Sequence, residues 1–276
     1  MIYLYTFCVF INRFSQEELK NALSCLVSSL NKTNKYELHI FTNIDISSYA
    51  STNVIIHEYF DNSQHIYDDK WLNLSFNKIH IYKFLFDTYD IDFTWIDLDT
   101  IVVDNIEYIQ ELPSAFIDTG GNNKDPHLLL TNTDIYIPRD LWIQGNFWKI
   151  NKHLYTIFID LNTEKNKQGQ FFCYDLQSIY TYYFYYVLQC ENDNLLRNDI
   201  YIIGRNYKTI VLNGLAIWNE NGNKHPNMDG LSNLYYEEGK MKSHLYPENE
   251  IHFLSFTFYT LNQLIQTTKF IELFGT

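Results

Sequence analysis

The hydrophobic positions in the first third of the chain change between strand and helix spacing. Residues 2–11 (IYLYTFCVFI) are mostly apolar and predict a buried strand. Ser15 then begins Ser-Gln-Glu-Glu, the capping-box pattern of a helix start. The hydrophobic residues after it recur at helical spacing: Leu19, Ala22, Leu23, Leu26 and Leu30. The chain is therefore expected to open with a strand and an amphipathic helix.

The next segments repeat this order. Residues 36–42 (YELHIFT) and 54–57 predict two short strands, and residues 93–97 predict another. Between them, Ser75 is expected to open a helix with one apolar face formed by Ile79, Tyr82, Phe86 and Tyr89. A β-α-β-β-α-β order predicts a mainly parallel sheet covered by helices, with ligands bound outside the carboxyl ends of the strands.

The second half of the sequence is less regular. Strands are expected at 114–118, 142–150, 200–204 and 250–256, and helices near 151–164 and 175–190. The sequence contains no internal repeat and no linker rich in Pro, Gly or Ser. We therefore expect one α/β domain over residues 1–276, with a mixed, mainly parallel sheet flanked by helices.

Composition narrows the class of partner. The chain has 276 residues, of which 46% are hydrophobic, so it has ample material for a core. Its formal net charge is -13, with 33 acidic residues against 20 Lys and Arg. This balance argues against binding DNA or RNA, because neutralising phosphates needs a basic surface.

The cysteines and the apolar runs bear on location. Cys8, Cys25, Cys173 and Cys190 form no CxxC pair, so they are expected to be buried thiols in a reducing compartment. No apolar run approaches the roughly 20 residues that span a bilayer. We expect a cytoplasmic protein without a transmembrane segment, and peripheral association with a membrane stays open.

Two carboxylates, Asp97 and Asp99, stand in the apolar stretch FTWIDLDTIVVDN. Residues two apart in extended chain face the same side, roughly 6.5–7 Å apart. Between Asp87 and Glu107 there are seven acidic residues and no Lys or Arg. Either their pKa values rise, a distant basic residue folds in, or a divalent cation neutralises them. Oxygen ligands alone suit Mg²⁺ or Mn²⁺ better than zinc.

The chain contains an internal comparison for this pair. Asp90-Ile91-Asp92 has the same spacing, but it stands in the polar segment TYDIDF, where solvated carboxylates need no cation. The strand context of Asp97 and Asp99, rather than their spacing, therefore indicates a metal site.

The segment WIDLDTIVVDN resembles the metal-binding motif of GT-A glycosyltransferases, and the order of elements before it is similar to theirs. The resemblance implies that Asp97 and Asp99 hold Mn²⁺ or Mg²⁺, with Asp97 also contacting the donor ribose. In glycogenin-like members, the helix before the motif carries a basic residue beside the donor nucleotide, and Lys78 matches it. Their C-terminal Ile-His-Phe-x-Gly is similar to residues 251–255 (IHFLS), and the resemblance implies that His252 is a third metal ligand. Ser255 replaces the Gly, and the Lys-Pro-Trp that often follows is absent.

The resemblance implies further contacts. Asn12 and Arg13 follow the first strand, where these enzymes meet the nucleobase. Gly145 and Asn146 interrupt an apolar strand, and glycine inside a strand often marks close approach by a ligand. Asp175 opens the next helix and is the candidate general base or sugar-orienting group. Structural roles fit the same residues, namely a loop that caps the sheet and an N-cap.

The function implied is metal-dependent transfer of a hexosyl or pentosyl group from a nucleotide sugar, most simply a UDP-sugar, to a hydroxyl of a glycan acceptor. Residues 1–105 would bind the nucleotide sugar and residues 106–276 the acceptor. Two alternatives stay open. A haloacid-dehalogenase-like phosphatase would use Asp97 as its nucleophile, and a non-catalytic protein would bind carbohydrate through its many aromatic residues.

Overall fold

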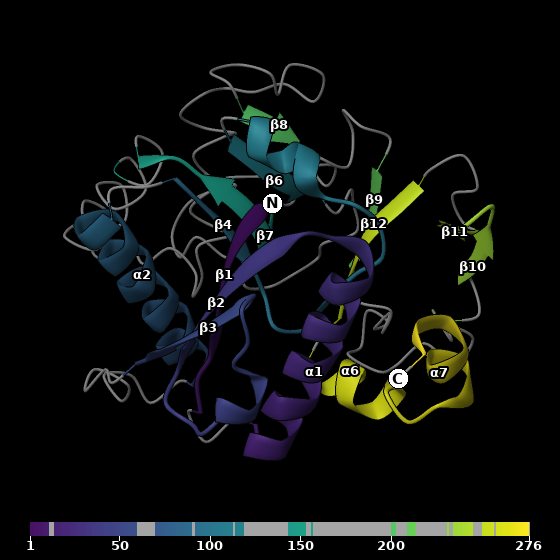
Figure 1. Cartoon of the computed structure of the whole chain (residues 1–276), viewed down its shortest axis with the longest axis horizontal. Helices are drawn as coiled ribbons and strands as arrows, with labels where there is room; N and C mark the ends of the chain where they lie inside the picture. The colour runs from purple at the N-terminus through teal and green to yellow at the C-terminus, as the bar shows by residue number, and fades with distance from the viewer. Residues whose placement is uncertain are drawn as a thin grey trace, which may run out of the picture.

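The computed structural model describes residues 1–10, 14–59, 70–89, 92–112, 114–118, 143–152, 156, 200–202, 209–213, 231, 234–244, 250–256 and 258–275. Within these residues a seven-stranded sheet forms the centre, and two long helices lie beside it (Figure 1). A smaller three-stranded sheet and the C-terminal helices lie on the side of the first helix.

The central sheet has the strand order β3-β2-β1-β4-β7-β6-β8. Its strands are β1 (Ile2–Cys8), β2 (Tyr36–Thr42), β3 (Val54–Glu58), β4 (Phe93–Ile96), β6 (Ser114–Asp118), β7 (Ile143–Ile150) and β8 (Ile200–Ile202). Four of the six strand pairs are parallel, and the two pairs that involve β7 are antiparallel. The prediction of a mixed, mainly parallel sheet flanked by helices is confirmed.

Strand β1 ends three residues before the predicted end of the strand at 11. Cys8 is the last residue paired with β2, where it lies opposite Thr42. Beyond it, the Asn43 side chain takes over the role of a partner strand. Its Oδ1 accepts from Phe10 N at 2.7 Å, and its Nδ2 donates to Phe10 O at 3.0 Å. The side chain of Asn43 therefore satisfies the backbone groups of Phe10 after the pairing with β2 has ended.

Helix α1 (Gln16–Thr33) starts where the capping box predicts. Glu18 N donates to Ser15 Oγ at 3.1 Å, and Ser15 N donates to Glu18 Oε2 at 2.7 Å. The five predicted apolar positions of the helix are all buried. They belong to one core cluster with Ile2, Leu4 and Cys8, so α1 covers the face of β1 that carries its even-numbered residues.

Helix α2 (Lys70–Tyr89) covers the opposite face of the sheet. Tyr82 packs against Phe93, Trp95 and Trp148, with ring centroids 4.9 to 6.0 Å apart. The prediction that Ser75 opens this helix was wrong by five residues. Residues 70–74 (KWLNL) include Lys and two Leu, which are good helix formers, and they extend the helix upstream.

The smaller sheet has the order β5-β12-β9, formed by β5 (Thr100–Val102), β12 (Glu250–Ser255) and β9 (Thr209–Asn213). It packs on the α1 side, where Ser29 Oγ of α1 accepts from Val102 N at 3.1 Å. Strand β12 confirms the strand predicted at 250–256, whereas β5 and β9 were not predicted.

Short elements complete the described chain. They are the 3₁₀ turns η1 (Ser47–Tyr49) and η2 (Glu107–Glu111), the hairpin β10 (Leu234–Glu237) and β11 (Lys240–Ser243), and the helices α6 (Phe258–Leu264) and α7 (Thr268–Phe274). None of the helices in the described ranges has the length and apolar character needed to cross a bilayer. The predicted helices near 151–164 and 175–190 lie almost wholly outside the described residues.

Candidate functional site

The acidic pair lies where an open α/β sheet ordinarily binds its ligands. Strand β1 is flanked by β2 on one side and β4 on the other, and it is parallel to both. The chain order therefore reverses at β1, and the crevice at such a switch point opens at the carboxyl ends of the strands. Asp97 is the first residue after β4, so the sheet topology puts it at this edge.

A tight turn carries the two carboxylates. Thr100 N donates to Asp97 O at 3.2 Å, which closes a β-turn over residues 97–100 and sends the chain into β5. Phe256 N, just beyond β12, donates to Asp99 O at 3.0 Å. The turn is thus held between the end of β4 and the end of β12.

Asp97 is paired with the lysine that the sequence analysis singled out. Lys78 Nζ lies 2.6 Å from Oδ1 and 2.8 Å from Oδ2 of Asp97. Trp95 Nε1 donates to Oδ1 at 2.7 Å. The side chains of Lys78 and Asp97 are 13% and 21% exposed, so this is a largely buried ion pair. The distant basic residue that the sequence left open is therefore present.

Aromatic rings enclose the lysine. Lys78 Nζ lies 5.7 Å from the ring centroids of Phe7 and Trp95 and 5.6 Å from that of Trp148. We call these three rings the aromatic cage. The rings come from β1, β4 and β7 on the face covered by α2, so helix and sheet together fix the ammonium group beside Asp97.

Asp99 is the acidic residue of the site whose pKa is shifted furthest. Burial raises the pKa of its carboxyl, and the neighbouring Asp97 raises it further, while Lys78 lowers it; the result is about 8. Two carboxylates thus share one lysine, and one of them is costly to ionise. Mg²⁺ and Mn²⁺ are held by one or two carboxylates together with substrate phosphates, so this oxygen donor set fits such a cation.

The raised pKa of Asp99 predicts how stability depends on pH. In the absence of divalent cations, the stabilisation from protonated Asp99 is complete below about pH 4 and is lost as the pH rises through about 8. The maximum slope for one proton is about 1.4 kcal/mol per pH unit, and partial exposure should limit the total loss to about 1–3 kcal/mol. Asp99→Asn should therefore flatten the fall.

Urea unfolding of both proteins at pH 5 and pH 8, with EDTA present, measures this difference. Other groups that titrate in this range, such as His57, contribute equally to both proteins and cancel. Parallel curves for Asp99→Asn and the unsubstituted protein would contradict the prediction.

The structure does not bring His252 to the acidic pair. Strand β12 is antiparallel to β5, with Ser255 opposite Thr100 and Phe253 opposite Val102. His252 therefore lies at the far end of the pairing, where its carbonyl accepts from Val103 N at 2.9 Å. Asp99, in contrast, lies at the other end of β12, where its carbonyl accepts from Phe256 N.

His252 lies beside a different carboxylate, that of Asp104. His252 Nε2 is 3.9 Å from Asp104 Oδ2, and Lys240 Nζ is 2.8 Å from the same oxygen. Burial raises the pKa of Asp104, but the bonds from Lys240 and Asn105 N and the nearby His252 hold it below its ordinary value. Asn34, which precedes β2, donates to Asp104 O at 3.3 Å, so this group lies at the amino ends of the strands.

Gly145 and Asn146 lie in β7 next to the acidic turn. Phe147 pairs with Ile96, the last residue of β4. Because the two strands are antiparallel, Asn146 and Gly145 come next along β7 on the side where Asp97 follows β4. The pairing of β7 with β6 shifts between Gln144 and Trp148. The glycine thus marks an irregular stretch of β7 beside the site, as expected of glycine in a strand.

The remaining predicted site residues, Asn12, Arg13 and Asp175, lie outside the described residues. Among the described residues, no group of three or more His, Cys, Asp or Glu side chains converges as a metal site would require. Within the part of the chain that the structure describes, the acidic pair is therefore a two-carboxylate set.

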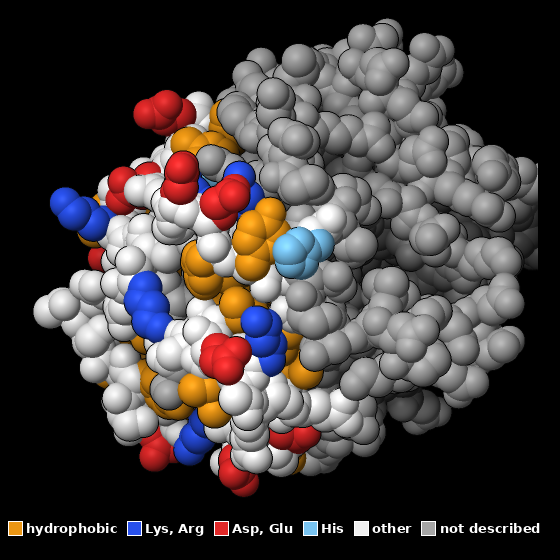
Figure 2. All heavy atoms as spheres, turned by 90° about the vertical axis from the view of Figure 1, so that its right-hand side faces the viewer, with side chains coloured by type: hydrophobic (Ala, Val, Ile, Leu, Met, Phe, Trp, Pro, Cys, Tyr) orange, Lys and Arg blue, Asp and Glu red, His pale blue; other side chains and the backbone are white. Residues whose placement is uncertain are grey.

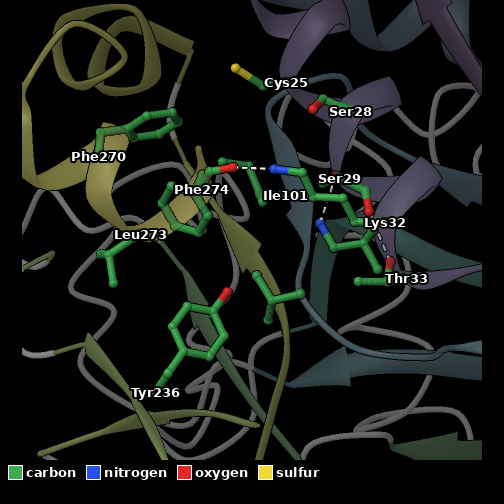
Figure 3. Close-up of a pocket in the computed structure, with 12 residues that line it drawn as sticks. Cys25, Ser28, Ser29, Lys32, Thr33, Ile101, Tyr236, Phe270, Leu273 and Phe274 are labelled. Carbon is green, nitrogen blue, oxygen red and sulfur yellow. Dashed lines mark hydrogen bonds between the residues drawn. The ribbon is translucent and has the colours of Figure 1, made fainter. Parts of the chain in front are cut away.

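A separate cavity of about 100 Å³ lies beside β5 (Figure 3). It is lined by residues of α1, β5, β10 and α7, among them Ile101 and Phe274. Lys32 spans it and donates to Gly275 O at 3.3 Å. The cavity therefore lies between α1 and β5.

The surface near the C-terminal elements carries mixed charge. Figure 2 shows this face, where Lys and Arg side chains alternate with Asp and Glu side chains around small hydrophobic groups. On the described part of the face there is no continuous basic stripe such as a nucleic acid would need.

Sequence reasoning missed one partner of Asp97 and one ring beside Lys78. Trp95, whose indole donates to Asp97, was read only as part of an apolar strand, and Phe7, whose ring centroid lies 5.7 Å from Lys78 Nζ, was not singled out. The available signal was the two-residue spacing of Trp95 and Asp97, which puts both side chains on one face. No family model and no curated protein matches this chain.

Proposed function

We propose that the protein is a metal-dependent glycosyltransferase that moves a sugar from a nucleotide-sugar donor, most simply a UDP-sugar, to a hydroxyl of a glycan acceptor. One observation carries the proposal: two carboxylates and a caged lysine meet at the carboxyl end of β4, at the switch point of the sheet. Such a crevice suits a nucleotide, and this charge pattern suits a diphosphate held through a cation.

In this proposal Asp97 and Asp99 hold Mg²⁺ or Mn²⁺. The bound cation would act as a Lewis acid that stabilises the negative charge developing on the diphosphate leaving group. Lys78 partly compensates the charge of Asp97, because its ammonium lies 2.6 Å from the carboxylate inside the aromatic cage. Asp99 would supply the second negative charge for the cation, because burial and Asp97 make its carboxylate costly to ionise without one.

The other parts of the reaction stay as predictions. Asn12 and Arg13 are proposed to contact the nucleobase, Gly145 and Asn146 the donor sugar, and Asp175 the acceptor hydroxyl as a base or orienting group. Residues 1–105 would form the donor half and residues 106–276 the acceptor half. The contacts of His252 support a place in the Asp104 group rather than in the cation site.

Nucleotide titration tests this function. Fluorescence of the tryptophans near the turn should report binding of UDP or a UDP-sugar, and chelating the divalent cation should weaken that binding by roughly tenfold or more. Phosphatase activity that Asp97→Asn abolishes, without nucleotide binding, would favour the haloacid-dehalogenase alternative instead. Sugar binding that needs neither cation nor nucleotide would favour a carbohydrate-binding protein.

A further inference from the structure

The carboxylate of Asp97 is held unevenly. Its Oδ1 accepts from Trp95 Nε1 at 2.7 Å and lies 2.6 Å from Lys78 Nζ, whereas Oδ2 accepts from Lys78 Nζ at 2.8 Å and from no other described residue. Each carboxylate oxygen can accept about two hydrogen bonds. Oδ1 is therefore saturated by these two donors, and Oδ2 retains capacity for one more ligand.

The pleat of β4 explains why the indole reaches this oxygen. Residues 95 and 97 are two apart, so their side chains leave the same face of the sheet, the face covered by α2. Asp97 is the first residue after the strand, and its side chain points along the edge where Trp95 Nε1 ends. The sequence Trp-Ile-Asp at the strand end thus builds the contact locally.

The indole is a rigid donor. Trp95 is fully buried, and its backbone pairs with Tyr5 on one side and Trp148 on the other. Its ring packs against Tyr82 at 4.9 Å and Phe7 at 5.5 Å. Lys78, in contrast, reaches Asp97 through a flexible side chain from another element. Of the two donors, Trp95 therefore fixes the orientation of the carboxylate.

We infer that Trp95 is a positioning residue for cation binding: its indole N–H fixes the rotation of the Asp97 carboxylate so that Oδ2 faces the cation shared with Asp99. This inference rests on the proposed function, because it assumes a cation between the two acids. It assigns a role to a tryptophan that touches neither the cation nor the substrate.

Trp95→Phe tests the role, since it keeps an aromatic ring in the strand and removes the N–H donor. The affinity for Mn²⁺, measured by electron paramagnetic resonance on the complete chain without nucleotide, should fall by about 10–100-fold, as for other groups that orient a metal ligand. Trp148→Phe is the matched control. It trims the same atoms from the same aromatic cage, 5.6 Å from Lys78 Nζ, so it measures the cost of the smaller ring alone, and the Mn²⁺ affinity of Trp95→Phe should lie about tenfold or more below that of Trp148→Phe.

A second measurement needs no metal and no Trp95 variant. In the ¹⁵N–¹H spectrum the indole N–H of Trp95 should lie downfield and exchange slowly, and Asp97→Asn should move it upfield and speed its exchange. An indole signal that Asp97→Asn leaves unchanged would overturn the positioning role.

The two failures can be told apart. If the wild-type protein binds no Mn²⁺, the proposed function is overturned. If the wild type binds Mn²⁺ and Trp95→Phe binds it equally well, or if Trp148→Phe weakens binding as much as Trp95→Phe does, only the positioning role is overturned.

Discussion

Replacing Asp99 with asparagine is expected to lower metal-dependent kcat/KM by at least ~100-fold while leaving the fold intact. The substitution keeps the size of the side chain but removes the charge that burial and Asp97 make costly, with a pKa of about 8. A cation bound to Asp97 alone would be held weakly, because Lys78 already compensates that carboxylate. Losing one preorganised group that stabilises a developing anion, here the cation that Asp99 would hold, typically costs two to three orders of magnitude.

The matched control is Asp92→Asn, in the other Asp-x-Asp of this chain. Asp92 is exposed, and its Oδ1 accepts from Lys152 N at 3.3 Å, so its substitution should change kcat/KM less than twofold, within the usual ~0.5 kcal/mol of surface changes. Turnover should be followed as release of UDP with Mn²⁺ at saturating and limiting concentrations. Full activity of Asp99→Asn would remove the acidic pair from the mechanism.

The first half of the fold could be predicted because local patterns decide it. The capping box of Ser15 and Glu18 forms as expected, and the apolar positions of α1 are buried. The two-residue period of a strand indicates which of its side chains share a face of the sheet. The strand predicted at 36–42 has the observed bounds. In these elements, propensity and tertiary packing favour the same structure.

Tertiary contacts decide the parts that could not be predicted. Strand β5 has three residues, and it forms because it pairs with β12, in which Phe253 lies 151 positions beyond its partner Val102. That antiparallel pairing separates His252 from Asp99, although both motifs resemble those of one family. The order of motifs along a chain does not reveal at which end of a strand a side chain will lie.

The acidic pair shows both sides of this limit. Its setting at the end of a strand could be predicted, because an apolar run stops at Asp97. The identity of its counter-charge could not, because Lys78 comes from α2 and meets Asp97 only after the helix packs across β1 and β4. The sequence left three alternatives, namely raised pKa values, a distant basic residue or a divalent cation. The structure has a lysine beside Asp97, and burial with the neighbouring Asp97 raises the pKa of Asp99 to about 8.

This unequal pairing leads to the largest expected effect on stability. Lys78→Met should lower the free energy of unfolding of the metal-free protein by about 3–5 kcal/mol at pH 7.5, because it leaves the Asp97 carboxylate uncompensated in a largely buried site. Adding Asp97→Asn should recover most of that loss, since methionine and a neutral amide can share the aromatic cage without a buried charge. Urea unfolding of the two single variants and the double variant, closed as a thermodynamic cycle, measures the coupling.

A second lysine in α2 separates this effect from the general cost of removing a lysine. Lys83 pairs with Asp87 one turn apart, with both side chains at least 60% exposed, so Lys83→Met should cost only about 0.5 kcal/mol or less. Saturating Mn²⁺ should stabilise Lys78→Met more than the wild type, because the cation then supplies the positive charge that Lys78 no longer provides beside Asp97. If Lys78→Met and Lys83→Met lose equal stability, or if Asp97→Asn restores nothing, the buried pair does not hold this edge of the sheet. The same result would leave the raised pKa of Asp99 as the remaining support for a cation site.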